Sequence, residues 1–298
     1  MKSMENLTPK QAEVLLLSVI VARSTSFMFS KMTLQTMSAF SLLGTRFLLA
    51  FAILCVLCCG KLRQLRWRTV ARGALIGAIY FGVMSLEMAG LKTTGTGETS
   101  FLENSAIVIV PLLNAALLRK IPSAAVIGSS AAALLGVGFL TLGGGVQGFS
   151  QGKVMCLLAA VAYSVGIIAT DRLTRKEDPL LLGVLQVGFM GFFSFLAALF
   201  TGTWRLPDTP REWGIVVVLA VVCTVFGFTL QPVAQSKTDV EKAGLFCAAN
   251  PVSATVLGAV FLHEQLYPQS YAGIALVLAS ILLPKLWPLR RRTAPHMA

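Results

Sequence analysis

Charged residues are scarce in this sequence of 298 residues. Asp, Glu, Lys and Arg make up 13% of it, whereas apolar residues make up 55%, and the mean hydropathy is +0.76. A soluble domain carries about 25% charged residues, so this chain has too few to cover a water-facing surface. The composition argues against a soluble globular enzyme, and the high hydrophobicity argues against a disordered chain. It predicts a membrane protein that crosses the bilayer many times.

Residues and motifs for metal binding and catalysis are also few. There are two His, and the six Cys lie in apolar stretches without a neighbouring His. We therefore expect no metal site, no disulfide and no cofactor. The chain has no GxxxxGK[ST] phosphate-binding loop, which argues against a pump driven by ATP. It also lacks the HExxH, paired Asp or Ser/His arrangement of an intramembrane protease, so we expect that it is not an enzyme.

Ten stretches are long and apolar enough to cross a bilayer, which takes about 20 residues. The first of them lacks a small-residue cleavage site, so we expect no cleaved signal peptide. The expected spans lie at about 11–30, 39–59, 70–90, 99–118, 122–142, 152–171, 179–200, 212–232, 240–262 and 268–287. Because Gln231 is followed by Pro232, we expect the eighth helix to end or break there.

The connections between these spans differ in positive charge. If the N-terminus is cytoplasmic, 18 of the 25 Lys and Arg lie on the cytoplasmic side and 5 on the opposite side. This distribution follows the positive-inside rule and predicts that both termini are cytoplasmic, in a plasma (inner) membrane. It also accounts for the net charge of +12 without a nucleic-acid partner.

The chain contains an internal repeat. With a shift of 145 residues, segment 99–128 matches 244–273 in its pattern of small residues, an apolar helix, a short turn and a second small-residue helix. Each repeat, 1–146 and 147–298, would hold five spans, and an odd number inserts the second copy upside down. The predicted fold is an all-α membrane protein with ten transmembrane helices in two inverted five-helix repeats, an arrangement typical of secondary transporters.

Several short motifs resemble those of a known family. His263-Glu264-Gln265-Leu266, followed by Gly273–Leu278, closely resembles the end of an EamA repeat. Arg46-Phe47, Lys31 and Asn250-Pro251 are similar to other positions of the same repeat. The chain is thereby identified as a member of the drug/metabolite transporter superfamily. This resemblance implies ten helices, alternating access without ATP and, most commonly, export by proton antiport; its motifs specify a fold and not a substrate.

Four charged residues fall inside the expected spans of the first repeat: Arg23, Arg46, Glu87 and Glu103. A charge at mid-bilayer costs about 2.5–3.5 kcal/mol, so such residues pair or line a wet cavity. We expect a neutral cluster in which Arg23 binds a substrate carboxylate and Glu103 binds an amine or a coupling proton. The alternative is a structural pair between Glu103 and either arginine. We expect Arg46 to be structural, and Glu87 to be a proton-coupling or charge-pair residue or a carboxylate at the outer headgroups.

Polar and aromatic residues in other spans complete the candidate site. A buried tyrosine or amide can orient a ligand, although hydrogen bonds between helices are the alternative for each. Glu103 and Asn114 are three turns apart, so an unbroken fourth helix would place them on one face. The further candidates are Tyr80, Asn104, Asn114, Tyr163, Gln186, Gln231 and Asn250.

These observations predict a secondary-active transporter. We expect it to export a small polar or amphiphilic metabolite, such as an amino acid or a related compound. The alternatives are an uptake carrier for an organic cation or a nucleoside-like metabolite, and a passive channel. The expected partners are the small-molecule substrate and the lipid bilayer. We expect a monomer, because ten spans can enclose a site alone.

Overall fold

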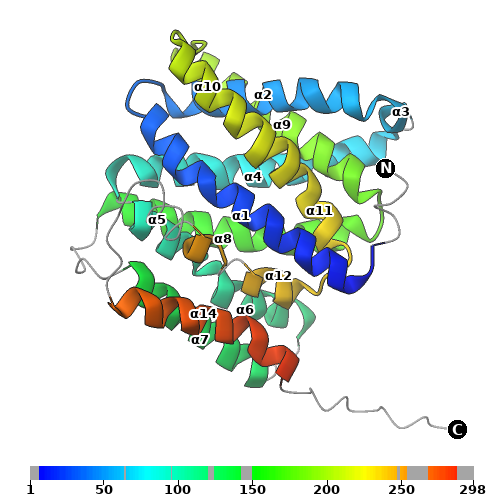
Figure 1. Ribbon diagram of the computed structural model, residues 1–298. Coiled ribbons are helices and arrows are strands. Elements are labelled where there is room, and N and C mark those ends of the chain that lie inside the picture. Colours follow the sequence, from blue (N-terminus) through cyan, green and yellow to red (C-terminus); the bar gives the residue numbers. More distant parts are fainter. Residues whose placement is uncertain are drawn as a thin grey trace, which may run out of the picture.

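The structure, a computed structural model, describes residues 7–63, 65–94, 96–119, 124–141, 150–246, 249–253 and 268–286. In these ranges the regular elements are helices, and they pack side by side in one bundle (Figure 1). The prediction of an all-helical protein is confirmed for this part of the chain.

Six helical stretches are long and apolar enough to cross a membrane, and two shorter apolar helices, Leu102–Leu118 and Val126–Gly136, accompany them. The protein is therefore an integral membrane protein. The six are α1 (Pro9–Thr33), α2 (Ala39–Leu57), α4 (Trp67–Thr93), α8 (Gln151–Thr174), α9 (Pro179–Phe200) and the stretch Pro210–Gln235. A one-turn helix, α3 (Cys59–Leu62), follows α2.

The last two expected spans are described in part. Helix α12 (Val240–Phe246) covers the start of the expected span 240–262, of which residues 254–262 lie outside the described residues. Helix α14 (Pro268–Leu286) coincides with the expected span 268–287. The His263–Leu266 motif also lies outside the described residues.

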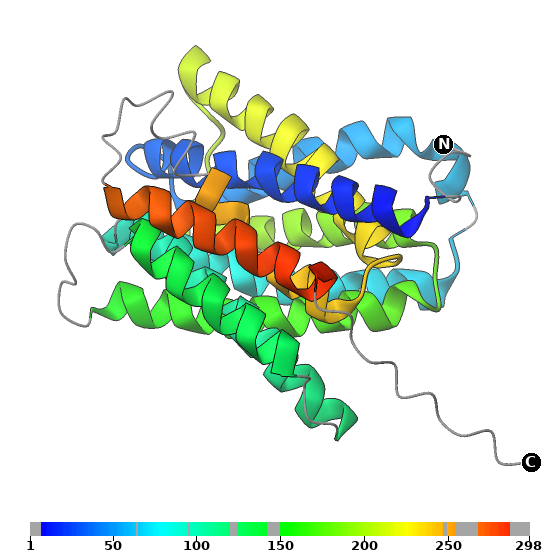
Figure 2. The same ribbon diagram turned by 60° about the horizontal axis from the view of Figure 1, so that its bottom comes forward.

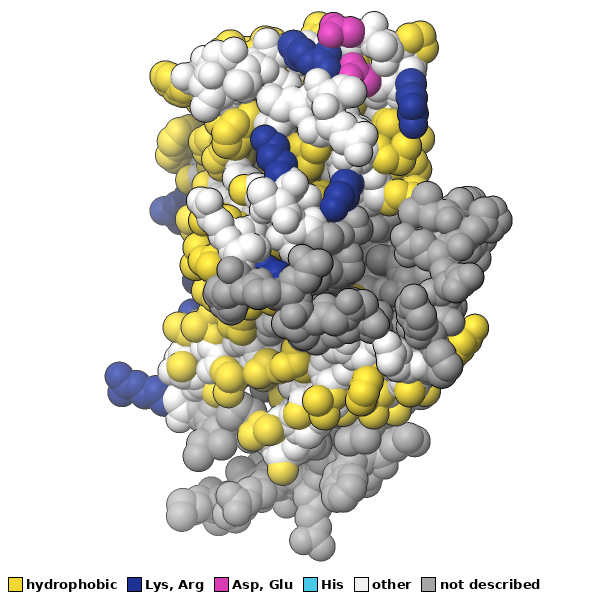
Figure 3. Space-filling view, turned by 90° about the vertical axis from the view of Figure 1, so that its left-hand side faces the viewer, with side chains coloured by type: hydrophobic (Ala, Val, Ile, Leu, Met, Phe, Trp, Pro, Cys, Tyr) yellow, Lys and Arg dark blue, Asp and Glu magenta, His cyan; other side chains and the backbone are white. Residues whose placement is uncertain are grey.

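The exposed surface of the described helices is largely apolar. Val14, Val21, Leu158 and Val165 on α1 and α8 are exposed, as suits side chains that face lipid. Figure 3 shows the molecule from the left-hand side of Figure 1, where Lys and Arg side chains and a few Asp and Glu side chains lie among apolar ones.

Helices distant in sequence pack together in the bundle. Helix α4 lies against both α8 and α9, α2 lies against α9, and α1 crosses the stretch Pro210–Gln235. Helix α7 (Ala124–Thr141) pairs with α14 along one edge of the bundle, as Figures 1 and 2 both show. The centre of the bundle is thus built from α1, α4, α8 and the stretch Pro210–Gln235.

The fourth expected span is interrupted. It consists of α5 (Thr96–Asn104) and α6 (Ala106–Leu118), with a turn at Ser105. The Asn104 amide donates to the Ser100 carbonyl over 2.5 Å, and so competes with the backbone for this acceptor. The backbone at Ser105 keeps right-handed helical dihedral angles, with φ −55° and ψ −16°, so the turn is local. The expectation that Glu103 and Asn114 share one face stays a prediction.

The stretch Pro210–Gln235 contains a wide helical segment. Helix α10 (Pro210–Val218) leads into a π-helix, η2 (Leu219–Phe228), and then into α11 (Thr229–Gln235). The hydroxyls of Thr224 and Thr229 donate to carbonyls five residues earlier, over 3.0 and 3.4 Å. The expected break at Pro232 is wrong, because the helix continues through it and the irregular turns lie before it. Such π turns are frequent at functional sites.

Each end of the bundle has a hydrogen bond between a threonine and a glutamate that joins a loop to the third residue of a helix. At one end the threonine is in the loop, and at the other end the glutamate is in the loop. Thr36, three residues past the end of α1, donates to Glu212, the third residue of α10, over 2.6 Å. Glu177, three residues past the end of α8, accepts from Thr69, the third residue of α4, over 2.7 Å. An arginine reinforces each glutamate: Arg205 bonds to Glu212 over 2.9 Å, and Arg72 bonds to Glu177.

Candidate substrate site

Arg23, in the middle of α1, is held by uncharged side chains. Its Nη1 atom donates to the Gln231 Oε1 atom over 2.6 Å and to the Tyr163 hydroxyl over 3.1 Å. Its guanidinium carbon lies 4.0 Å from the centre of the Phe228 ring, which is a cation–π contact. In the described part of the chain, no carboxylate lies within 4.0 Å of its nitrogens, and the side chain is only half-buried. Arg23 is thus a positioned cation that keeps accessible surface.

A glycine allows this placement. A Cβ atom at Gly227 would lie 2.7 Å from the Cγ atom of Arg23, closer than such atoms approach. The stem of Arg23 therefore lies directly against the backbone of η2, and any larger residue at 227 would push the guanidinium away from Phe228.

Tyr80, on α4, completes the layer around Arg23. Its hydroxyl accepts from the Gln231 Nε2 atom over 3.1 Å. Its ring meets the rings of Tyr163 and Phe228 edge-on, with centroids 6.0 Å apart in both cases. Gln231 therefore bridges Arg23 and Tyr80. These two partners fix the orientation of its amide, because the oxygen accepts from Arg23 and the NH₂ group donates to Tyr80.

Two buried carboxyl groups lie near this layer. Glu87 is 3% exposed and Glu103 is 4% exposed. Their side chains lie within reach of each other, and both are close enough to Arg23 to feel its charge. A hydrogen bond between two carboxyl groups requires a proton on one of them. The Oε2 atom of Glu103 is buried and has no partner among the described residues. Glu87 is thus enclosed by protein.

Arg46, on α2, is enclosed in a different way. The side chain is 0% exposed. Its Nε atom donates to the Thr224 hydroxyl over 2.8 Å and its Nη1 atom donates to the Ser26 hydroxyl over 3.0 Å. No ion pair within 4.0 Å joins Arg46 to a carboxylate in the described ranges. The four charges are neighbours, but neither arginine forms a direct ion pair with either glutamate.

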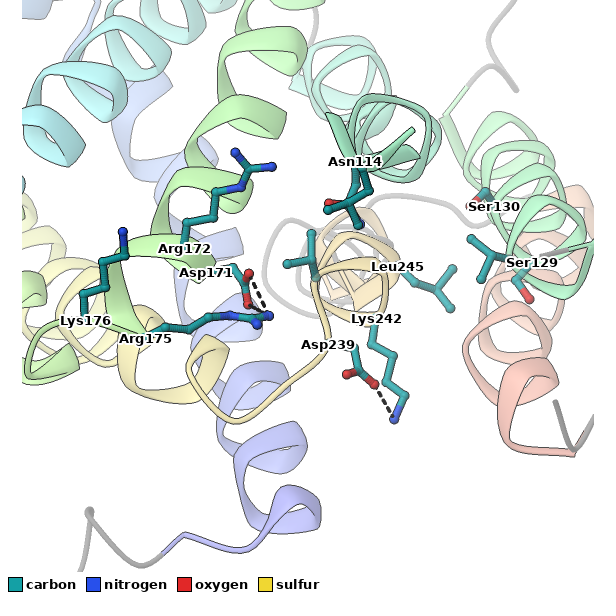
Figure 4. A pocket seen from close by; sticks show the side chains of 13 residues that line it. Asn114, Ser129, Ser130, Asp171, Arg172, Arg175, Lys176, Asp239, Lys242 and Leu245 are labelled. Atoms are coloured by element: carbon teal, nitrogen blue, oxygen red, sulfur yellow. Dashed lines mark hydrogen bonds and ion pairs between the residues drawn. The ribbon is translucent and has the colours of Figure 1, made fainter. Parts of the chain in front are cut away.

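In the described part of the chain, none of the remaining predicted residues is hydrogen-bonded to Arg23, Tyr80, Tyr163 or Gln231. Asn104 bonds to its own helix. Gln186, on α9, is fully buried, and neither atom of its amide has a partner in the described part of the chain. The Oδ1 atom of Asn250 is likewise buried and unbonded there. Asn114 lines a cavity of about 570 Å³ between the ends of α6, α7, α8 and α12 (Figure 4).

Sequence reasoning grouped Arg23, Glu103, Tyr80 and Tyr163 as candidates, and the structure brings these four to one place. It did not select Phe228, whereas Gln231 was both a candidate for the cavity and the site of an expected helix break. A spacing of three residues puts Phe228 and Gln231 on one face of a helix. This spacing could have predicted that the two side chains lie together.

The fold and this polar layer define a class of protein, a polytopic membrane protein with charged and aromatic side chains gathered inside its helix bundle. Comparison with known proteins gives the family. The family model described as "EamA-like transporter family" matches residues 10–142 and, a second time, residues 150–284. The chain therefore belongs to the EamA-like transporter family.

Individual relatives share a quarter or less of their residues with this chain in the two matches that follow. The "Uncharacterized transporter YcxC" of Bacillus subtilis is 25% identical over 290 residues, which cover 92% of each chain. The "Biotin transporter" of Salmonella typhimurium is 23% identical over 174 residues, which cover 57% of this chain and 56% of that protein. This second match thus spans little more than half of the relative. A crystal structure of another protein superposes with a TM-score of 0.76 at 20% identity, over 93% of this chain and 97% of the other, and shows the same fold.

Proposed function

We propose that the protein is a secondary-active transporter that exports a small amphiphilic metabolite with a carboxylate group, such as an amino acid or a related compound. The observation that carries this proposal is the state of Arg23. It is positioned by Tyr163, Gln231 and Phe228, it has no carboxylate at contact distance among the described residues, and part of it is accessible. A cation inside a membrane protein that is oriented but not neutralised suits a ligand anion.

The neighbouring groups have complementary roles in this proposal. The guanidinium of Arg23 binds the substrate carboxylate, since its fork of donors matches two carboxylate oxygens. Glu103 offers its free Oε2 atom to an amine of the substrate. The proton between Glu87 and Glu103 is the coupling proton, and its release on one side of the membrane drives antiport.

We further propose that ten spans form two inverted five-helix repeats, 1–146 and 147–298, in a monomer of the plasma membrane with both termini in the cytoplasm. Two observations support the repeats. The family model matches once in each half. The hydrogen bonds Thr36–Glu212 and Thr69–Glu177 have equivalent positions with exchanged partners at opposite ends of the bundle. A two-fold axis in the membrane plane would bring a loop of each half against a helix start of the other half, as in these two hydrogen bonds.

The second candidate is uptake of an organic cation or a nucleoside-like metabolite. The observation in its favour is the buried Glu87–Glu103 pair, which would become a cation site on losing its proton. A passive channel is the third candidate, and it differs from a carrier because it shows no counterflow.

The test uses purified protein in liposomes. Vesicles are loaded with amino acids, biotin, organic amines or nucleosides, and entry of the labelled compound is measured with and without a pH gradient. Biotin is included because a relative bears the name of a biotin transporter. We expect saturable counterflow of a carboxylate compound, acceleration by an opposing proton gradient, and loss of both in Arg23→Gln. Counterflow of amines alone would contradict the proposal, and flux without counterflow would indicate a channel.

A further inference from the structure

The cavity that Asn114 lines has an uneven distribution of charge. It lies between the ends of α6, α7, α8 and α12 and holds about 570 Å³, a volume suited to a small-molecule ligand. Figure 4 shows Arg172, Arg175 and Lys176 on its α8 side, and Ser129 and Ser130 on the opposite, α7 side. One wall of the cavity is therefore cationic and the other carries hydroxyl groups.

Only part of this positive charge is neutralised. Arg175 pairs with Asp171 over 3.1 Å, and Lys242 lies 3.4 Å from Asp239. Lys242 also lies 3.2 Å from Glu13, on α1. Within the described ranges the side chains of Arg172 and Lys176, which are exposed at the end of α8, have no hydrogen-bond or ion-pair partner. The cavity thus retains two cations that are free to attract an anion.

The rest of the lining suits the body of an amphiphilic solute. Leu118, Val126 and Leu245 supply apolar surface. The Ser129 hydroxyl is buried and has no partner among the described residues, so it is available to a polar atom of a ligand. An anionic group at the α8 wall with an apolar body across the cavity would satisfy both walls.

Helix α8 reaches both the cavity and the Arg23 layer. Asp171, which lines the cavity, and Tyr163, which bonds to Arg23, are eight residues apart on α8, or about 12 Å along its axis. The cavity and the Arg23 layer thus lie at two levels along α8.

We propose that this cavity is a second binding position, which takes the carboxylate of an amphiphilic organic acid at Arg172 and Lys176 before that group reaches Arg23. This inference rests on the proposed function, because it names the acid as the transported solute. It distinguishes between the candidate substrates, since a cavity with two unpaired cations disfavours an organic cation.

The experiment introduces a reporter cysteine by Val126→Cys, because Val126 lines the cavity and is only half-buried. Inside-out vesicles are treated with the anionic sulfonatoethyl and the cationic trimethylammonioethyl methanethiosulfonate. The protein without the introduced cysteine gives the background rate. We expect the ratio of anionic to cationic rates to fall at least about threefold when Arg172→Gln and Lys176→Gln are added. Arg66→Gln with Arg68→Gln removes equal charge elsewhere on the same predicted side of the membrane, and should leave the ratio unchanged.

A protection measurement tests ligand binding in the same vesicles. We expect 3-phenylpropanoate to slow the modification of the introduced cysteine and 3-phenylpropylamine not to, with protection lost in the Arg172/Lys176 variant. If the double variant does not fold, Arg172→Gln alone is used. An unchanged rate ratio, equal protection by the amine, or no modification of the cysteine would overturn the inference. Because modification requires no transport, a protein that binds the acid here but shows no counterflow would refute the proposed function and leave the cavity site standing.

Discussion

Arg23 and Arg46 lie in the same bundle and contact the same aromatic ring, yet they are held differently. Their guanidinium carbons are 4.0 and 5.9 Å from the centre of the Phe228 ring. Arg46 is fully enclosed and donates to two hydroxyl groups, whereas Arg23 is half-buried and donates to a phenol and an amide. In the proposed function, Arg46 serves the fold and Arg23 binds the ligand.

The largest effect on stability is expected at Arg46. Arg46→Gln leaves the hydroxyls of Thr224 and Ser26 without their donor and opens a void in a packed region, so we expect a loss of about 3 kcal/mol. Thermal unfolding in detergent, followed by size-exclusion chromatography, measures it. Arg46→Lys keeps the charge and should recover part of the loss. An Arg46→Gln protein that keeps full stability but has lost transport would show that Arg46 contributes to substrate binding.

Arg23→Gln should show the opposite pattern. Since Arg23 forms two hydrogen bonds to neutral groups, we expect a loss of about 1 kcal/mol in stability and at least about a tenfold loss of transport. Initial counterflow rates and thermal unfolding of the same preparation give the two values. Arg23→Lys keeps the charge without the planar fork and should retain only part of the activity. Equal losses of stability for the Arg23 and Arg46 variants would remove the distinction between them.

Much of this arrangement follows from the sequence, and some of it does not. Hydropathy predicts the spans, and the cost of intramembrane charge singles out Arg23, Arg46, Glu87 and Glu103. The π-helix could not be predicted from the sequence. Its hydrogen bonds join residues five apart instead of four apart, and this change leaves the hydropathy pattern unaltered. The turn at Ser105 accompanies a side-chain hydrogen bond of Asn104 to the Ser100 carbonyl, which the sequence does not reveal. Gln231 appears as a helix breaker beside proline, and its role as a bridge depends on contacts with two other helices.

A smaller effect on substrate affinity is expected at Gly227. Gly227→Ala places a methyl group where the Cγ atom of Arg23 lies, so the guanidinium shifts and substrate binding weakens about fivefold, equivalent to about 1 kcal/mol. Gly214→Ala lies in the same membrane stretch with nothing within 4 Å of its added methyl and is the matched control. The apparent affinity in counterflow measures the change. Identical behaviour of the two variants would mean that the exact position of Arg23 has no influence on binding.

The smallest effect is expected for a cation that does have a carboxylate partner. Outside the membrane, Lys61 donates to Asp178 over 2.7 Å. Burial raises the pKa of the Asp178 carboxyl, but hydrogen bonds from Lys61 and from the backbone N–H groups of Leu180 and Leu181 outweigh it, so the pKa lies below its ordinary value. The contribution to stability is thus complete above the ordinary aspartate pKa of about 4 and is lost as pH falls through the lower, folded-state value.

Asp178→Asn tests this, because asparagine keeps the helix cap while removing the charge. We expect a difference of less than about 1 kcal/mol at pH 7, which narrows as the pH approaches 3. Unfolding temperatures across this range supply the comparison. A difference that grows on acidification would show that the sign of the pKa shift is wrong.

The most direct test of the central claim is ligand-induced thermal stabilisation of the purified protein. A panel of amino acids, amines, carboxylates and nucleosides is applied at pH 5.5 and 7.5 to the wild type, Arg23→Gln, Glu103→Gln and Arg46→Lys. The account predicts that a carboxylate-bearing compound stabilises the wild type and Arg46→Lys, and that Arg23→Gln loses this stabilisation while remaining folded. Stabilisation that survives Arg23→Gln would contradict it, because Arg23 would then serve the fold as Arg46 does.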